Sequence, residues 1–590
     1  MGSYASMEVI GSLFYWEEEP AVQQQPAAEA PRAVNRAPAG LVRTEEVIAK
    51  KGCIPVSGRY TNERELEQDY TLLDKVLGTG MSGPVHLAEG KADGRKYAVK
   101  SFKKSGLSLR NRQELKNEAE LYLQLDHPHI AQLSMIFETD QVLHLVMEYM
   151  EGGELYDRLA KQKRYTEEEA ADAVYQMLLA VAYLHTNKIA HRDLKLENFL
   201  YERKDTNHLK LIDFGFAKFW DPNTRMSQAC GSVHYVAPEV LFQCYTTQAD
   251  MWSVGIIAYM LLTGSPAFHG ADKEILKRIK VGKPHFSTRF ARLSENAQSF
   301  VKQLLVRSPT ERLSAQLALE HPWIKGRHSA NSATIDTSIL GCLRGYAEAS
   351  RFRRAALCMM AWSLSTEEQQ ELREQFLLLD SQKRGSITLK QLKLMLEENF
   401  DVGGEEAERL FSMIDSDNSQ EIEYSEFLAA ALVGRVNAHG DVLRRTFARF
   451  DRDGGGLISQ DELRTVLGDH FEGEDIEDLI KEVDTSGDGQ IDFDEFLAYF
   501  QRSEPLAEEL GTSPTVAVAE DTERTSRRRR TQRLTAVIDN LLSSPDIKCG
   551  AEVATPKPMQ PRLSRRSQTM PLSLPVLLGT AGVRAEDKGM

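Results

Sequence analysis

Several features that would assign this chain to a familiar class of protein are missing from it. It has only six cysteines in 590 residues, and none forms a C-x-x-C pair, so we expect neither a disulfide framework nor a zinc site. No apolar run reaches the roughly 18 residues that span a membrane, and no secretory hydrophobic segment follows Met1. The net charge of −15 gives no global indication of nucleic-acid binding. We expect a cytoplasmic monomer without nucleic-acid partners.

The chain is too long for a single hydrophobic core, so several domains are expected. The acidic excess is concentrated between residues 366 and 501, whereas the region before it has an ordinary mixture of charges. This difference in composition indicates that at least two regions of different function are joined in one chain.

A short polar stretch carries the clearest chemistry. Residues 191–198 read H-R-D-L-K-L-E-N, and a D-F-G triplet begins at Asp213. Phosphoryl transfer needs a carboxylate base, a cation beside the moving phosphoryl group and oxygen ligands for Mg²⁺. Asp193 would accept the proton of a substrate hydroxyl, and Lys195 would lie beside the phosphoryl group. Asn198 and Asp213 would hold Mg²⁺. A chance acidic loop is the alternative, which the D-F-G spacing disfavours.

A glycine-rich stretch precedes that site. Residues 78–85 read G-T-G-M-S-G-P-V, and glycines allow the backbone to approach phosphates closely. A dinucleotide-binding fold uses the same spacing but would continue into a helix. Residues 97–100 instead read Y-A-V-K, an alternating strand that ends in lysine. Lys100 would contact the α and β phosphates, and Glu118 on the next predicted helix would pair with it. Glu120 is the alternative partner.

Together these motifs resemble the eukaryotic protein kinases over residues 70–324. Residues 145–150, L-V-M-E-Y-M, resemble the strand and hinge that hold adenine, and an A-P-E triplet at 237–239 has a matching arginine at Arg312. The resemblance implies a bilobal α+β kinase that uses ATP and Mg²⁺ on protein substrates. The ATP-contacting residues that it implies are Gly78, Thr79, Gly80, Met81, Ser82, Gly83, Val85, Ala98, Lys100, Glu118, Met147, Glu148, Met150 and Glu154.

Departures from the kinase pattern are small. Leu196 replaces the usual proline of the catalytic loop, and Val233 and His234 occupy the peptide-positioning loop, where other residues are more frequent. Glu154 and Glu197 lie where kinases that prefer basic substrates recognise an arginine three residues before the target. The alternative for both glutamates is an ordinary solvated surface.

Four segments recur at about 35-residue spacing in residues 366–502. Each has a loop of the EF-hand pattern between two helical patterns, and the predicted hands are 366–400, 401–436, 437–472 and 473–502. Calcium requires about seven oxygen ligands, including a bidentate carboxylate at loop position twelve. Four helix–loop–helix units without metal are the alternative, which the acidic spacing disfavours. We therefore predict an all-α calcium-binding domain after the kinase.

Three of the four loops carry the required ligands. In the second loop Gln420 replaces the turn glycine, at a cost of about 1 kcal/mol. In the third, Gly455 at position five offers no side chain, so water must substitute. The fourth loop has the best-formed ligand pattern. The predicted calcium ligands are Asp415, Asp417, Ser419, Glu421, Glu426, Asp451, Asp453, Gly455, Leu457, Glu462, Asp484, Ser486, Asp488, Gln490 and Glu495.

The first loop departs from this pattern. It begins at Asp380 but has Gln382 and Arg384 at positions three and five and Gln391 at position twelve. An arginine opposes a divalent cation, and a neutral amide cannot act as a bidentate anion. We expect about three calcium sites and a first hand that only pairs structurally with the second.

A basic amphipathic segment, residues 325–365, joins the two regions. Apolar side chains such as Leu343 and Phe352 alternate there with arginines, as in helices that calcium-loaded EF-hands bind. An ordinary linker helix is the alternative. Kinase, junction and four EF-hands in this order resemble the calcium-dependent protein kinases of plants, green algae and alveolate protists. The resemblance implies that the junction blocks the cleft and that calcium relieves this autoinhibition.

Both ends of the chain are predicted to be disordered. Residues 1–69 begin with M-G-S-Y-A-S, the pattern for myristoylation of Gly2, and residues 503–590 contain four arginines at 527–530. One myristoyl chain binds membranes only weakly, and the basic block could supply the second signal for a peripheral membrane contact. A solvated basic run is an equally good interpretation of that block.

Two other functions fit parts of the sequence. A pseudokinase scaffold would sense calcium without catalysis, but Lys100, Asp193, Asn198 and Asp213 are all intact. An always-active kinase would use the EF-hands only for docking, but the junction's amphipathic character argues against this.

Overall fold

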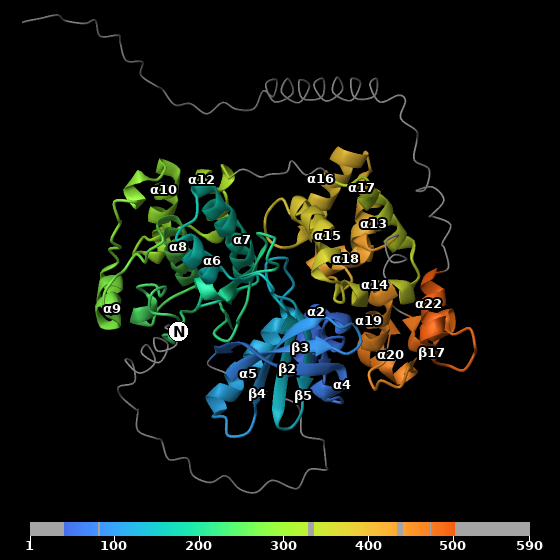
Figure 1. Cartoon of the computed structure of the whole chain (residues 1–590). Helices are drawn as coiled ribbons and strands as arrows, with labels where there is room; N and C mark the ends of the chain where they lie inside the picture. The colour runs from blue at the N-terminus through green and yellow to red at the C-terminus, as the bar shows by residue number, and fades with distance from the viewer. Residues whose placement is uncertain are drawn as a thin grey trace, which may run out of the picture. The chain divides into compact units, whose positions relative to one another are not determined.

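A computed structural model describes residues 41–80, 83–327, 335–433, 440–468, 470–472 and 474–501 (Figure 1). The predictions for Gly2, Met81, Ser82 and the tail 503–590 fall outside the described residues. The fold class predicted from the sequence is confirmed: a bilobal kinase fold is followed by a helical EF-hand region.

A six-stranded sheet forms the smaller lobe of the kinase region, drawn in blue in Figure 1. The strand order is β1-β5-β6-β4-β3-β2, and every neighbouring pair is antiparallel except β1 and β5. Helix α5 packs beside the sheet. It begins after Ser108, whose hydroxyl accepts the N–H of Asn111, and it buries Leu115, Ala119 and Tyr122 on one face. These elements are β1 (Tyr60–Thr61), β2 (Tyr70–Gly80), β3 (Gly83–Gly90), β4 (Lys96–Lys103), α5 (Leu109–Gln124), β5 (Leu133–Glu138) and β6 (Val142–Glu148).

The larger lobe is mainly helical. Its central helices α7 and α8 are apolar on nearly all sides because both lie in the core. The helices are α6 (Leu155–Gln162), α7 (Glu167–Thr186), α8 (Gln248–Thr263), α9 (Asp272–Val281), α10 (Glu295–Leu304), α11 (Ala315–Leu319) and α12 (Pro322–Lys325). The short strands are β7 (Gly153–Glu154), β8 (Ile189–Ala190), β9 (Phe199–Tyr201), β10 (Leu209–Leu211) and β11 (Lys218–Phe219). Four 3₁₀ turns lie at Leu196–Asn198, Val240–Phe242, Phe290–Arg292 and Pro309–Glu311.

Four helix–loop–helix hands form the second region, drawn in yellow to orange in Figure 1. Short antiparallel strands join the loops in pairs: Ile387 faces Ile422, and Ile458 faces Ile491. The helices are α15 (Thr366–Leu379), α16 (Leu389–Phe400), α17 (Gly404–Ile414), α18 (Tyr424–Ala431), α19 (Gly440–Phe450), α20 (Gln460–Leu467), α21 (Ile476–Val483) and α22 (Phe493–Gln501). The strands are β12 (Ile387–Thr388), β13 (Glu421–Ile422), β14 (Leu457–Ile458), β15 (His470–Phe471), β16 (Glu474–Asp475) and β17 (Ile491–Asp492).

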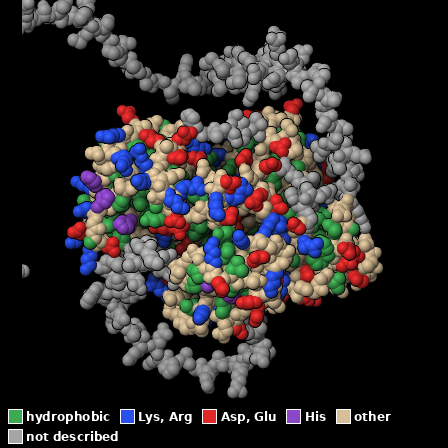
Figure 2. Space-filling view, viewed as in Figure 1, with side chains coloured by type: hydrophobic (Ala, Val, Ile, Leu, Met, Phe, Trp, Pro, Cys, Tyr) green, Lys and Arg blue, Asp and Glu red, His purple; other side chains and the backbone are tan. Residues whose placement is uncertain are grey.

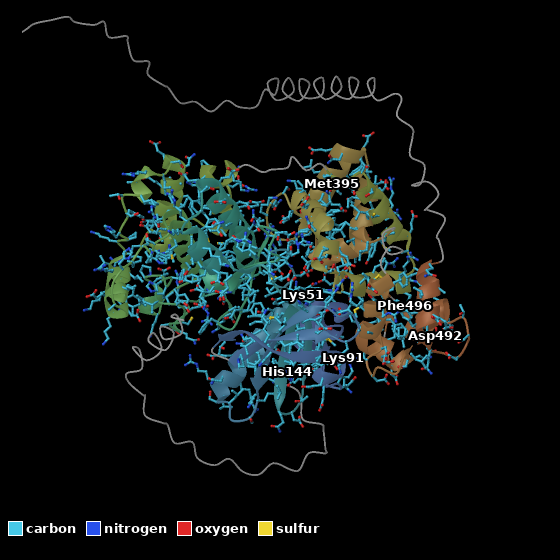
Figure 3. All side chains as sticks on the ribbon, in the orientation of Figure 1. Lys51, Lys91, His144, Met395, Asp492 and Phe496 are labelled. Carbon is cyan, nitrogen blue, oxygen red and sulfur yellow. The ribbon has the colours of Figure 1, made fainter. Side chains whose placement is uncertain are left out.

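The junction forms two helices, α13 (Ser338–Glu348) and α14 (Arg351–Ala361), that are buried by the EF-hands. Leu343 and Phe352 lie in one core with EF-hand residues that include Met395 and Phe496, both labelled in Figure 3. Arginines at the edge of this core bind acidic or aromatic EF-hand residues: Arg344 to Glu406, Arg354 to Glu472, and Arg353 over Phe500. The apolar side of the junction thus lies in the EF-hand core, and its arginines lie at the edge of that core.

The predicted disorder of residues 1–69 is wrong for its second part, because residues 41–69 are ordered. They form α2 (Thr44–Lys51), α3 (Cys53–Ser57), β1 and α4 (Leu66–Asp69). Val47 and Val56 are buried in the kinase core, whereas Ile54 is buried in the EF-hand core. Tertiary burial therefore stabilises elements that are too short to be stable alone. Residues 1–40 lie outside the described part.

Acidic and basic side chains are interspersed over the described surface that Figure 2 presents. Within the described ranges, no helix has both the length and the apolar character needed to cross a bilayer.

Candidate active site and cation-binding loops

Lys100 on β4 is held in place by two carboxylates. Its Nζ lies 2.7 Å from Glu118 Oε1 and 3.0 Å from Asp213 Oδ1. Glu120, the alternative partner, lies instead beside Lys116 and accepts the backbone N–H of Arg43. The lysine, the helix α5 and the D-F-G segment are therefore in mutual contact.

The proximity of opposite charges shifts the pKa values of Lys100 and Asp213 toward their charged forms. Burial disfavours the Lys100 ammonium, but Glu118 and Asp213 outweigh this effect and raise its pKa. Burial would also raise the pKa of Asp213, but the nearby Lys100 lowers it to about 2. Asp213 consequently stays anionic at neutral pH, as a carboxylate ligand for Mg²⁺ must.

Asp193 is the centre of the catalytic loop and is 4% exposed. Lys195 Nζ donates to its Oδ2 at 2.7 Å, and Asn198 Nδ2 donates to its backbone carbonyl at 2.9 Å. Ser232 Oγ donates to its Oδ1 at 2.9 Å. The sequence predicted the first three residues but not Ser232, which is 39 positions from Asp193. Ser232 directly precedes Val233 and His234 of the peptide-positioning loop, and that position was the available sequence signal for it.

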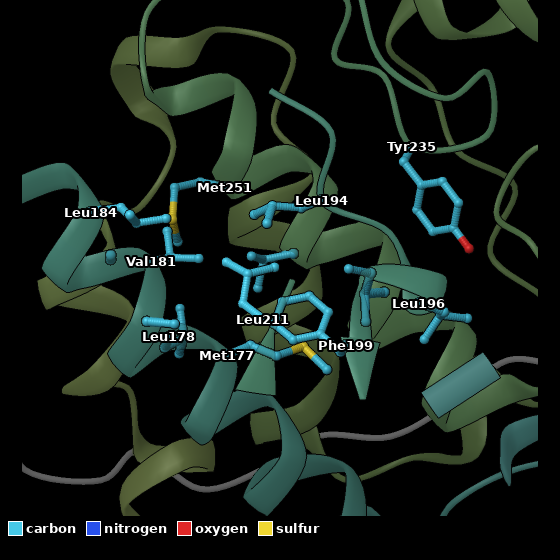
Figure 4. Packing of buried hydrophobic residues seen from close by; sticks show 14 of the residues in the cluster. Met177, Leu178, Val181, Leu184, Leu194, Leu196, Phe199, Leu211, Tyr235 and Met251 are labelled. Atoms are coloured by element: carbon cyan, nitrogen blue, oxygen red, sulfur yellow. The ribbon is translucent and has the colours of Figure 1, made fainter. Parts of the chain in front are cut away.

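Backbone bonds and apolar contacts hold the catalytic loop. The Asp250 carboxylate of α8 accepts the N–H groups of His191 and Arg192 at 3.0 and 2.8 Å. Leu194 and Leu196 are both fully buried in the kinase core, and Figure 4 shows Leu194 near side chains of α7 and α8. Leu196 therefore supports the loop through packing, and its departure from proline does not disturb the reacting groups.

Edge-to-face aromatic contacts link α5 to the catalytic loop. The ring of Phe214 contacts Tyr122 and His191, with ring centroids 5.1 Å apart in both pairs. Asp213 has φ = 63°, a left-handed conformation that costs free energy in a non-glycine residue and that packed surroundings must impose. Tyr122 follows Glu118 by one helical turn, and this spacing was the available sequence signal for it.

The remaining ATP-contacting predictions lie on strands around Lys100. Thr79 lies on β2, Gly78 faces Val85 across β2 and β3, and Ala98 faces Met147 across β4 and β6. Met147 and Met150 are nearly buried, at 8% and 6% exposure. Gly80 ends β2 and Gly83 begins β3. The Glu148 side chain is bound elsewhere, by Lys210 at 2.8 Å, so its predicted contact with adenine involves the backbone.

Glu154 and Glu197 lie in one acidic cluster with Asp157. Burial raises the pKa of Glu154 to about 7, and the nearby Asp157 and Glu197 add to this shift. A neighbouring cation would relieve the repulsion.

The activation segment ends with the predicted ion pair, in which Arg312 Nη1 and Nη2 bind Glu239 at 2.6 and 3.2 Å.

The second and third EF-hand loops each gather three carboxylates. Asp415, Asp417 and Glu426 can place oxygen atoms within 4.8 Å of one another. The same holds for the equivalent residues of the third loop, Asp451, Asp453 and Glu462. Asp451 Oδ1 is buried and has no hydrogen-bond partner among the described residues. A buried, unpartnered carboxylate oxygen in a cluster of like charges fits a hard divalent cation.

The remaining predicted ligands lie in these loops and in the fourth. Ser419 Oγ donates to the Glu421 carbonyl at 2.8 Å, and Gln420 has φ = 70° where the pattern has glycine. The predicted third-loop positions Gly455 and Leu457 lie between Asp453 and Glu462, with Leu457 at the start of β14.

The carboxylates of the fourth loop are not gathered as closely as those of the second and third loops. Within the described ranges, three-carboxylate clusters occur only in the second and third loops. In the fourth, Asp484 accepts the N–H groups of Gly487 and Gly489, and Asp488 accepts that of Gln490. Glu495 accepts the N–H groups of Thr485 and Ser486. The same kind of backbone bond occurs in the second and third loops. The predicted ligands Asp484, Ser486, Asp488, Gln490 and Glu495 all lie in this fourth loop.

Comparison with known proteins agrees with both sites. The protein kinase domain family matches residues 71–324, and the EF-hand domain pair matches residues 369–432 and 441–501. Calcium-dependent protein kinase 11 of Oryza sativa subsp. japonica is 34% identical over 83% of this chain and 85% of its own length. Calcium-dependent protein kinase 4 of Plasmodium falciparum (isolate 3D7) is 34% identical over 72% and 84%. Calcium-dependent protein kinase 17 of Arabidopsis thaliana is 35% identical over 77% and 88%.

The family match joins the two sites in one activity. The kinase domain uses ATP and Mg²⁺ to phosphorylate protein substrates, and the EF-hands bind calcium and regulate the kinase within the same chain. No finding favours the pseudokinase alternative. Lys100 contacts Asp213, and Lys195 and Asn198 both bind Asp193. This chain belongs to the calcium-dependent protein kinases and is a calcium-activated serine/threonine kinase.

Proposed function

We propose that the junction, residues 325–365, occupies the substrate cleft when calcium is absent and that calcium-loaded EF-hands remove it. One observation carries this proposal. Phe352 and Leu357 of α14 are fully buried in the EF-hand core, while Lys100, Asp193 and Asp213 are in an assembled arrangement. The same apolar face cannot be in the EF-hand core and in the cleft at once.

Three calcium ions suffice for this switch. A change from 1:99 to 99:1 needs about 5.5 kcal/mol of differential binding. Three sites would each contribute roughly 1.8 kcal/mol, which is about a twentyfold preference per ion for the active state. The second, third and fourth loops are the proposed sites. The first loop, with Arg384 and Gln391, is proposed to bind none.

The catalytic groups have separate tasks. Asn198 and Asp213 would hold Mg²⁺, which would neutralise charge on the phosphates. Asp193 accepts the proton of the substrate hydroxyl, and Lys195 stabilises the charge that develops beside it. Glu154 and Glu197 are proposed to bind an arginine three residues before that hydroxyl. Their clustering with Asp157 supports this preference, because a guanidinium would relieve the repulsion among them.

The proposal extends to the location of the monomeric protein. Myristoylation of Gly2, with the basic block at 527–530, would hold the kinase peripherally on the cytoplasmic face of a membrane. Both features lie outside the described residues, so the sequence pattern is their support.

A calcium titration of the full-length protein tests the switch. Phosphorylation of a peptide with arginine at the third position before its serine is measured with Mg-ATP in buffered calcium, beside a peptide with alanine there. A steep rise with calcium and a preference for the arginine peptide are expected.

Asp193→Asn should reduce the rate at least about a hundredfold. A fragment ending at Ile324 should be active without calcium. Flat activity of the full-length protein across the series would contradict the junction model.

A further inference from the structure

Three buried charged side chains and the partly buried Glu148 form a series of ion pairs from the first EF-hand to the end of the hinge strand. Arg373 of α15 lies 2.9 Å from Glu202, and Lys210 of β10 lies 3.5 Å from the same Glu202 oxygen. Lys210 Nζ also donates to both carboxylate oxygens of Glu148, at 2.8 Å each. The side chains of Arg373, Glu202 and Lys210 are only 6%, 2% and 3% exposed. The ion pairs therefore lie in the interior, where each charge depends on its partners.

Positive and negative charges alternate along this series of ion pairs, and Glu202 is shared between the cations Arg373 and Lys210. Arg373 neutralises Glu202 from the EF-hand side, so Lys210 is left to bind Glu148 at shorter distance. Without Arg373, the one ion-pair partner left to Glu202 among the described residues is Lys210. Lys210 would then be drawn from Glu148 toward Glu202, because a buried carboxylate without a partner is costly.

A second series of contacts leads from α15 to Glu148. Gln369 lies one helical turn before Arg373 on α15, and its Nε2 donates to Gln132 Oε1 at 3.4 Å. The backbone N–H of Gln132 donates to Glu148 Oε1 at 2.6 Å. Both routes from α15 thus end on the Glu148 carboxylate.

Glu148 directly follows Met147 in the segment that holds adenine by its backbone. It ends β6, and its own N–H donates to the Gln132 carbonyl at 3.1 Å. A shift of about 1 Å in a binding segment can cost a large factor in activity. Fixing the Glu148 side chain consequently fixes the backbone that meets the nucleotide.

We propose that Arg373 is a positioning residue for ATP: when the first EF-hand packs on the kinase, its guanidinium fixes Glu148 through Glu202 and Lys210. The calcium-binding region then does more than remove the junction from the cleft. It supplies a cation that completes the nucleotide site. This role does not require the junction to block the cleft, so each idea can fail without the other.

The test is Arg373→Gln in the full-length kinase at saturating calcium. The KM for ATP should rise at least about fivefold, while kcat changes little and the KM for the peptide stays the same. Arg373→Lys keeps a cation and should recover most of the ATP affinity. Lys390→Gln removes an exposed charge from α16 of the same hand and should have no effect. Activation by calcium, which reports on the junction, should persist in all four proteins.

A second substitution separates positioning from a general loss of structure. In the double variant Arg373→Gln/Glu202→Gln, the carboxylate that draws Lys210 is gone, so the KM for ATP should return toward that of the unaltered protein. Binding of a fluorescent ATP analogue to the unaltered protein without calcium should be as weak as to Arg373→Gln. An unchanged KM in Arg373→Gln would overturn the proposal. A double variant as weak as the single one would overturn it as well, and this comparison holds even if Arg373→Gln lowers the melting temperature.

Discussion

The first and second EF-hand loops have the same backbone plan and different charges. In the first, Gln391 at position twelve accepts the N–H of Thr388 at 2.8 Å. In the second, Glu426 accepts the equivalent N–H of Glu423 at 2.9 Å. The first aspartate of each loop likewise accepts N–H groups from positions five and six. Hydrogen bonds within the turn therefore set the loop shape, and a neutral amide serves as well as a carboxylate.

The two loops differ in the side chains at the positions that would bind a cation. The second loop brings together three carboxylates, whereas the first has Arg384 at position five and a glutamine at position twelve. EF-hand geometry alone is consequently no evidence of calcium binding. The count of anionic ligands decides it.

The two loops also contact the kinase differently. In the second loop Glu423 pairs with Lys51, which is labelled in Figure 3, and Ser425 donates its N–H to Asp126 at 2.7 Å. In the first, Gly385 lies against the rings of Tyr183 and His127. The first loop thus serves as a packing surface, and the second loop, which has the three-carboxylate cluster, is also attached to the N-terminal segment.

The largest effect is expected from Glu426→Gln, which gives the second loop the position-twelve residue of the first. The turn should survive, since an amide can accept the same N–H groups, but the bidentate anion is lost. Calcium affinity of this site should fall by about two orders of magnitude. Isothermal titration should count one ion fewer than in the unaltered protein. Glu405→Gln, an exposed position on α17, is the matched control, and an unchanged ion count in Glu426→Gln would refute the assignment.

A smaller effect of the opposite kind is expected from Gly385→Ala in the first loop. Its φ of 82° disfavours a side chain, and the new Cβ would lie 2.6 Å from Tyr183 and 2.7 Å from His127. Packing on the kinase should weaken by about 1–3 kcal/mol. The calcium concentration for half-maximal activity should rise while the number of bound ions stays constant. Gly94→Ala has similar backbone strain in open space and controls for it; a change in ion count would mean that the first loop binds calcium after all.

Gln420→Gly in the second loop should have a smaller effect, a gain in calcium affinity. Gln420 has φ = 70° at position six, where the first loop has Gly385. Removing the left-handed strain should gain about 1 kcal/mol, or roughly fivefold in calcium affinity at the second site. Competition with a chelator of known affinity measures this change. Gln420→Ala retains the strain and should not bind more tightly; equal gains in both variants would mean that backbone strain is not the cause.

The sequence predicted the parts of the molecule in which chemistry restricts the residue type. Lys100, Glu118, Asp193, Asn198 and Asp213 were identified because phosphoryl transfer needs those groups in that order. The sequence shows that Leu196 departs from the usual proline, but its burial is visible only in the fold.

Contacts between regions left no comparable signal. Arg373 and Glu202 are 171 residues apart, and nothing near either residue in the chain indicates the other. The order of residues 41–69 was missed for the same reason, because helices as short as α3 and α4 are stabilised by burial and not by local periodicity. The fourth loop has the best-formed ligand pattern in the sequence, but within the described ranges a three-carboxylate cluster forms only in the second and third loops.

The smallest effect is expected from Gln391→Glu, which restores the position-twelve carboxylate of the first loop. Arg384 would still occupy position five, and the Lys383 ammonium lies within the same turn, where it donates to the Leu377 carbonyl at 2.7 Å. A single added carboxylate would mainly neutralise these cations, so titration should count the same number of calcium ions as before. Adding Gln382→Asp and Arg384→Asp to Gln391→Glu should create a further site, because three anions then replace two amides and a cation. If Gln391→Glu alone gained an ion, position twelve would outweigh the rest of the ligand set, and the count of anionic ligands would no longer explain the difference between the two loops.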